Sequence, residues 1–319
     1  MTYALLAAAI VCSAFTIVVS FTSLIAGAAA PRLARRVTRH SPASRAGALF
    51  SLRVLPAATG IVLAFGVALP IFLWFEPRDT NEPITLTLAV TSAMGLAALV
   101  RGAIKAIAAW GATRTVIRAW RRRGRAIALD ASIPVVAIDE AFPIVAVVGV
   151  ARPRLFISER VLNECSDDEV RAMVAHECSH VTARDNLKRF LIRACPDLLQ
   201  PPDFIEHAWS NAAEEAADAA AARNTPNTPQ RALDLAQALI HVARLAPQPH
   251  APALASAFYL GGSIESRVRR LLEADDVADP TRPFGWVFIT TVVCVFTIGV
   301  VAAAPAVHQL MEAAVRVLP

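Results

Sequence analysis

Long apolar stretches dominate the hydrophobic pattern of this chain. A bilayer core needs roughly 20 apolar residues in a helix, and we expect four such helices, at about residues 3–30, 54–75, 84–109 and 284–307. The first stretch lacks the basic leader of a cleaved signal peptide, so we expect it to stay in place. The pattern therefore predicts an α-helical integral membrane protein with four transmembrane helices, in line with its 55% hydrophobic composition.

The segment between the third and fourth stretches, residues 111–283, is the only part long enough to fold as a water-exposed domain. Val- and Ile-rich runs predict a small antiparallel sheet with strands at 133–138, 144–150 and 154–158. Ser166 and Glu169 then form a capping-box pattern, which predicts the start of a helix. Further helical segments are expected at about 204–222, 231–244 and 264–274. This region is therefore predicted to be an α+β domain.

Arginines predict the orientation of the spans. Loop 31–53 and the segment after the third span are rich in arginine and contain no acidic residue, which is typical of cytoplasmic segments. We therefore expect a multi-pass protein of the plasma membrane whose domain at 111–283 is cytoplasmic. Both chain ends, including a short tail at 308–319, are expected on the outer side of the membrane. The same arginines match anionic lipid headgroups, so we expect the lipid bilayer and no direct nucleic acid as a partner.

One motif carries candidate chemistry: His176-Glu177-Cys178-Ser179-His180 lies inside the helix that the capping box opens. Two histidines four residues apart face one side of a helix and can hold one Zn²⁺, while the glutamate beside the first can act as general base. We therefore predict that His176 and His180 are metal ligands and that Glu177 is catalytic. This combination indicates a zinc peptidase.

A catalytic zinc needs a third protein ligand, and a downstream pair of carboxylates can supply it. Glu214 and Asp218 lie one helical turn apart, so Glu214 can bind the metal while Asp218 orients His176. Glu215 is the competing ligand, although it points about 100° away around the helix. Asp185 follows His180 by five residues and either holds the motif helix to its neighbour or is a surface residue. An oxyanion-stabilising role for His207 or His241 stays open.

With these features the chain resembles the membrane metallopeptidases of the BlaR/MecR type, the beta-lactam sensor-transducer family. The matching elements are the histidine motif followed by Asp185, the pair Glu214 and Asp218, the run 149–158, the run 266–272 and a domain placed between a third and a fourth span. The resemblance implies a gluzincin-like fold and zinc-dependent cleavage of a cytoplasmic protein. In that family the substrate is a BlaI-type winged-helix repressor, so the resemblance implies a role in signal transduction.

The sequence departs from that family after the fourth expected span, where only about a dozen residues follow and no penicillin-binding domain is expected. Direct beta-lactam sensing is therefore not expected, and the signal would come through the spans, a homo-oligomer or a separate sensor partner. Two alternatives remain: a membrane-protein quality-control peptidase of the HtpX or CAAX-protease type, and a scaffold that holds zinc without catalysis. A structural zinc usually has four ligands, often cysteines, and no cysteine pair lies near these histidines.

Overall fold

The structure of the protein is a computed structural model, which describes residues 3–37, 41–77, 85–196, 198, 202–223, 228–245, 264–273 and 309. The expected fourth span at 284–307 lies outside the described residues. Within the described part, three helical units are long and apolar enough to cross a membrane by length and composition. They are α1 (Tyr3–Val37), the unit formed by α2 (Pro42–Leu63), η1 (Ala64–Ala68) and α3 (Leu69–Phe75), and α4 (Leu86–Arg123).

The second unit begins well before the expected position, and the prediction of a loop over 31–53 is wrong for most of that range. The helix α1 continues to Val37, and α2 starts at Pro42 after Ser41, whose side chain caps the backbone amide of Ser44. Serine followed by proline is a favourable helix start, and arginine is a good helix former, so basic residues did not mark a loop here. The π-helical turn η1 precedes Pro70, which cannot donate the normal helical hydrogen bond.

A four-stranded sheet forms the centre of the α+β domain. Its order is β1-β2-β4-β3, with strands Arg125–Ile127, Val135–Ile138, Arg154–Ser158 and Val145–Val148 in that order. The antiparallel prediction holds for β3 with β4, but it is wrong for β2 with β4, which are parallel. The strand β1 was not predicted, and it pairs antiparallel with β2. The strand β4 lies between β2 and β3. The hydrophobic alternation could not predict this order, because it identifies strands but not their neighbours in the sheet.

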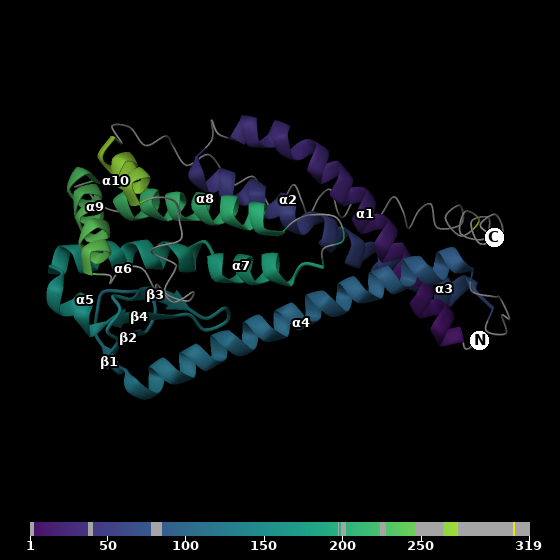
Figure 1. Ribbon diagram of the computed structural model, residues 1–319, viewed down its shortest axis with the longest axis horizontal. Helices are drawn as coiled ribbons and strands as arrows, with labels where there is room; N and C mark the ends of the chain where they lie inside the picture. Colours follow the sequence, from purple (N-terminus) through teal and green to yellow (C-terminus); the bar gives the residue numbers. More distant parts are fainter. Residues whose placement is uncertain are drawn as a thin grey trace.

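Both faces of the sheet are covered. On one face, Val135, Leu155 and Ile157 pack with the apolar sides of α6 and α9 in the largest core cluster. On the other face, Phe156 and its neighbours pack against Trp120 of α4. Figure 1 shows α4 running from the membrane helices to the sheet. The third expected span thus continues as one helix, α4, into the α+β domain and extends past the expected end at residue 109.

Six helices complete the described domain: α5 (Glu159–Glu164), α6 (Asp167–Thr182), α7 (Asp185–Ala194), α8 (Pro202–Arg223), α9 (Thr228–Leu245) and α10 (Ile264–Glu273). The expected capping box is present at the start of α6, where Ser166 and Glu169 exchange side-chain and backbone hydrogen bonds. The helix α8 packs along α2, where Phe50 and Trp209 belong to one buried cluster. Through α2 and α4, the membrane helices directly support the helices that carry the site.

Candidate active site

Three predicted ligands converge at one buried point between α6 and α8. His176 and His180 lie one turn apart on α6, and their Nε2 atoms are 3.2 Å apart. The carboxylate of Glu214, on α8, lies 3.3 Å from Nε2 of His176 and 3.6 Å from Nε2 of His180. All three residues are buried. The ligand atoms of this group lie within 4.8 Å of one another, as the atoms around one metal ion do.

Each histidine is contacted from behind by a second carboxylate. Nδ1 of His176 lies 3.0 Å from Asp218, which is one turn after Glu214 on α8. Nδ1 of His180 lies 2.8 Å from Asp185, the first residue of α7. Arg184, in the left-handed conformation with φ of 55°, turns the chain between α6 and α7 and brings Asp185 back to the motif. With Nδ1 protonated and bonded to these carboxylates, each Nε2 lone pair faces the centre of the site.

Arg267 is a site residue that the sequence reasoning missed. It lies on α10, it is only 1% exposed, and it donates two hydrogen bonds of 2.8 and 2.6 Å to the carboxylate of Asp218. Its guanidinium also lies 3.4 Å from Glu214. The sequence did contain a signal for its burial. Ile264 lies three residues before Arg267 and Leu271 lies four residues after it, so Arg267 is on the apolar side of an amphipathic helix.

Glu177 occupies the position beside the converging ligands that a general base needs. The side chain is 1% exposed, and Oε2 accepts a 2.9 Å hydrogen bond from the backbone amide of Val147 on β3. The other oxygen, Oε1, has no hydrogen-bond partner among the described residues. A buried carboxylate oxygen without a partner is costly unless a ligand or water supplies one. Burial, the largest influence, raises the pKa of Glu177.

The charges of the site favour a bound cation. Burial opposes a charge on His180, but the carboxylates of Glu214 and Asp185 outweigh it and raise the pKa of His180 to about 10. The pKa of His176 is raised in the same way, because hydrogen bonds to Asp218 and Glu214 exceed the effect of burial. Glu214 and Asp218 lie beside the guanidinium of Arg267, and Asp185 lies 3.0 Å from Lys188. Protons on the histidines supply further positive charge when no metal does.

The donor set fits a catalytic divalent ion. Two imidazole nitrogens and one carboxylate oxygen are ligands that Zn²⁺ prefers, and three protein ligands leave a fourth position for water or substrate. The carboxylates behind the imidazoles hold the neutral tautomer that a metal requires. Glu177, with its unpartnered oxygen, follows His176 in the sequence and interacts electrostatically with His176 and His180.

Other sequence candidates lie away from the centre. Glu215, the competing ligand, forms ion pairs with Arg45 of α2 and Arg270 of α10 instead. His241 contacts Glu169 at the far end of α6, and His207 lines a separate cavity. The geometry thus groups His176, His180 and Glu214 and leaves these three residues outside the group.

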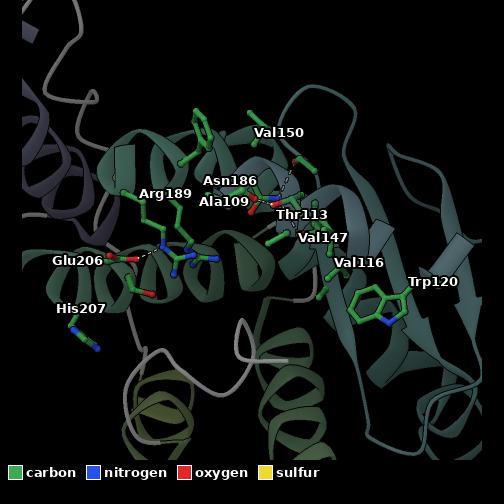
Figure 2. Close-up of a pocket in the computed structure, with 17 residues that line it drawn as sticks. Ala109, Thr113, Val116, Trp120, Val147, Val150, Asn186, Arg189, Glu206 and His207 are labelled. Atoms are coloured by element: carbon green, nitrogen blue, oxygen red, sulfur yellow. Dashed lines mark hydrogen bonds and ion pairs between the residues drawn. The ribbon is translucent and has the colours of Figure 1, made fainter. Parts of the chain in front are cut away.

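A cavity of about 410 Å³ lies beside the outer edge of β3, between α4, α7 and α8 (Figure 2). Trp120 and Val116 of α4 line one side, and Arg189 lines another. Asn186 donates hydrogen bonds of 3.0 and 3.2 Å to the backbone oxygens of Val147 and Gly149, and so fixes the edge strand next to Glu177. The sequence reasoning gave Asn186 no role, because an asparagine early in a helix has no distinguishing pattern.

A comparison with known families agrees with this geometry. Residues 125–201 match the sequence model of Peptidase family M48, a range that includes the sheet, the HExxH motif and α7 and ends before Glu214. No curated protein matches the chain. Peptidases of family M48 bind zinc, which is the ion that the grouped ligands His176, His180 and Glu214 fit. The chain therefore carries a peptidase family M48 domain joined to membrane-type helices, and it is a zinc metallopeptidase.

Proposed function

We propose that this protein is a membrane-embedded zinc endopeptidase that cleaves a protein chain at the cytoplasmic face, with Glu177 as its general base. The observation that carries the proposal is the convergence of His176, His180 and Glu214 at one buried point with Glu177 beside them. Bound there, zinc polarises the scissile carbonyl and brings the pKa of a water molecule toward neutrality. Hydrolysis adds that water across the carbon–nitrogen bond.

The role of Glu177 is to move protons. Its carboxylate takes a proton from the attacking water while the water oxygen bonds to the carbonyl carbon, and it later gives that proton to the leaving nitrogen as the carbon–nitrogen bond breaks. The hydrogen bond from Val147 to Oε2 holds the side chain in place and leaves Oε1 available. Asp218 and Asp185 position the two histidines through Nδ1 and need no contact with the substrate.

The substrate is proposed to bind as an added strand along β3. This strand is an edge of the sheet, since β4 is its only strand partner among the described residues. Its backbone at Val147 points away from β4 and already bonds Glu177 and Asn186. An added chain would displace the Asn186 side chain from this edge and would then lie beside Glu177. Main-chain hydrogen bonds would supply affinity, and the adjacent cavity would accept side chains. Replacing substrate residues next to the cut with proline should then block cleavage.

The expected membrane topology supports cleavage on the cytoplasmic side. The arginine-rich stretches at 31–53 and 114–125 mark the side of the membrane on which the peptidase domain would lie. By its resemblance to the BlaR/MecR type, the protein would cleave a BlaI-type repressor and so transmit a signal. A second substrate class is membrane proteins under quality control, and one observation favours it: the cavity at β3 is lined by α4, the helix that continues from the membrane span.

A comparison of protein N-termini in cells that express the wild-type chain or Glu177→Gln tests the proposal. One glutamate-dependent cut in a small DNA-binding protein supports the regulatory role and names the substrate. Many glutamate-dependent cuts in membrane proteins support quality control instead. If expressed, zinc-loaded wild-type protein yields no new N-terminus in cells or on an unfolded protein in detergent, the proposal fails.

A further inference from the structure

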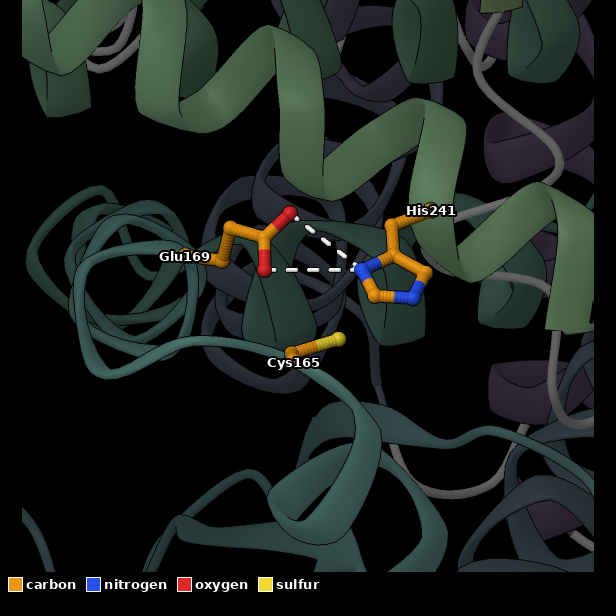
Figure 3. Close-up of side chains that lie close together, drawn as sticks. All are labelled: Cys165, Glu169 and His241. Carbon is orange, nitrogen blue, oxygen red and sulfur yellow. Dashed lines mark hydrogen bonds and ion pairs between the residues drawn. The ribbon is translucent and has the colours of Figure 1, made fainter.

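A second group of metal-ligating side chains lies apart from the catalytic centre. Cys165 ends α5, Glu169 lies in the first turn of α6, and His241 lies on α9. One ligand atom from each residue lies within 4.8 Å of the others. Figure 3 shows the thiol of Cys165 and the carboxylate of Glu169 directed toward the same side of the His241 ring. The residue that follows α5 and the helices α6 and α9 thus bring sulfur, oxygen and nitrogen donors close together.

The carboxylate of Glu169 directs one oxygen toward His241 while the other caps the helix. Its Oε2 accepts a 2.7 Å hydrogen bond from the amide of Ser166 and completes the capping box. Its Oε1 faces His241 and lies 3.3 Å from Nδ1 of that ring. Cys165 and Glu169 are buried, while the side chain of His241 is 35% exposed. The group therefore has an inner pair of ligands and an outer one through which an ion can enter.

The chemistry of the group favours a thiophilic divalent cation. Thiolate, imidazole and carboxylate together are ligands of Zn²⁺, whereas Mg²⁺ and Ca²⁺ prefer oxygen alone. Burial, with help from the carboxylates of Glu169 and Glu164, raises the pKa of Cys165 to about 11. A metal ion that binds this sulfur must therefore displace the thiol proton.

We propose that Cys165, Glu169 and His241 form a second zinc site, which joins the start of the catalytic helix α6 to α9. Three protein ligands are present, and a water molecule completes the coordination. The helix α9 packs against α6, α8 and α10, so the ion would hold together the layer that supports the catalytic ligands. This inference does not depend on which protein the enzyme cleaves.

Cobalt substitution of the full-length protein in detergent tests the second site separately from the first. A thiolate bound to Co²⁺ gives a charge-transfer absorption in the near ultraviolet, and the catalytic group contains no sulfur ligand. We expect this absorption in the wild-type protein and about two zinc ions per chain after zinc loading. Cys165→Ser and His241→Gln should each remove the absorption and one zinc ion. Cys195→Ser, which changes another buried cysteine, should change neither.

His241→Gln carries the decision if Cys165→Ser fails to fold, because the His241 side chain is partly exposed. Retention of the catalytic zinc shows that a variant is folded, and Glu214→Ala should lose that zinc while keeping the cobalt–thiolate absorption. The proposal is overturned if the wild-type protein binds one zinc ion and shows no such absorption, or if the absorption persists in Cys165→Ser. Neither result would bear on the catalytic group, whose zinc is lost only with Glu214 or the motif histidines.

Discussion

The two metal-facing histidines are each held by a buried carboxylate, and one of these carboxylates is itself held by Arg267. The guanidinium of Arg267 donates two hydrogen bonds to Asp218, which contacts Nδ1 of His176. Arg267 thus acts as a positioning residue: it holds the carboxylate behind His176 and also lies 3.4 Å from the ligand Glu214. Removing such a supporting group typically weakens metal binding by about 10- to 100-fold.

We predict that Arg267→Lys folds but binds catalytic zinc about 10- to 100-fold more weakly, because lysine keeps the charge and loses the paired hydrogen bonds. Arg267→Met should instead destabilise the protein by about 3–5 kcal/mol, since it leaves Asp218 buried without a counter-charge. Zinc affinity by competition with a chelator and thermal unfolding measure the two effects. The matched control is Arg269→Met on the exposed side of α10, which should bind zinc as the wild-type protein does. If Arg269→Met weakened zinc binding as much as Arg267→Lys, Arg267 would not be a positioning residue.

Protons and zinc should compete for the histidines. The raised pKa of His180, about 10, means that this side chain is protonated at neutral pH in the metal-free protein, so a zinc ion must displace that proton. Zinc binding should therefore release about one or more protons per ion near pH 7, and the apparent affinity should rise with pH. A pH-indicator titration in weak buffer measures this, in a Cys165→Ser background that removes the other titrating ligand. Affinity independent of pH between about 6 and 8 would contradict it.

At the residue scale, the sequence was informative where spacing on one helix decides the geometry. The i,i+4 histidines on α6 and the i,i+4 carboxylates on α8 face one another as the spacing predicted. Arg267 could not be placed in the same way, because its burial depends on how α10 docks against α8. Cys165 and His241 are 76 positions apart by their residue numbers, so only the tertiary structure brings them together.

The membrane-type helices α1 and α4 pack closely against each other in the described part. Thr16 of α1 donates a 2.8 Å hydrogen bond to the backbone oxygen of Thr91, and Ser13 lies 2.7 Å from the Thr91 hydroxyl. A Cβ atom at Gly95 would overlap the backbone oxygen of Cys12. Small residues and hydroxyl side chains of this kind let helices approach closely in a bilayer.

Gly95→Ala should therefore destabilise the helix pair by about 1–3 kcal/mol, because the clash is with backbone that cannot move aside. Gly111→Ala is the matched control on the same helix, since nothing lies within 4 Å of its added Cβ. That variant should be neutral or more stable by up to about 1 kcal/mol, as alanine is the better helix former. Thermal unfolding in detergent compares the two, and an equal effect of both changes would refute the close contact.

Among the elements, helices with strong caps were predicted well and the sheet less so. The capping box placed the start of α6 correctly, and α9 and α10 lie close to their expected ranges. The parallel pairing of β2 with β4 and the short strand β1 were missed, because both depend on contacts between segments rather than on local pattern. Charge misled the reading of 42–53, where a capped helix packs against α8.

At the scale of the whole molecule, α4 and α2 connect the membrane to the active site. The far half of α4 covers one face of the sheet, and α2 contacts the helix that carries Glu214. A movement of either membrane helix would therefore reach the peptidase domain without a flexible linker. The long apolar stretches predicted the three described membrane-type helices, and the hydrophobic pattern predicted a separate α+β domain. Neither could show that the single helix α4 belongs to both.

The proposed orientation makes a prediction for labelling in cells. A cysteine at exposed Asp130, in the peptidase domain, should react with a membrane-impermeant maleimide only after the cells are made permeable. A cysteine at exposed Pro77, after α3, should react in intact cells. Both changes belong in a background that lacks the native cysteines. The reverse pattern would place the active site outside and exclude a cytoplasmic substrate.

The most direct test of the account measures bound zinc and hydrolysis of an unfolded protein on the same purified samples. Glu177→Gln should keep the zinc content of the wild-type protein and lose turnover by about 10²- to 10⁴-fold or more, because it removes only the base. Glu214→Ala should lose the catalytic zinc and activity together, whereas Glu215→Gln should keep both. Full zinc content and turnover in Glu214→Ala, or wild-type turnover in Glu177→Gln, would contradict the proposed centre.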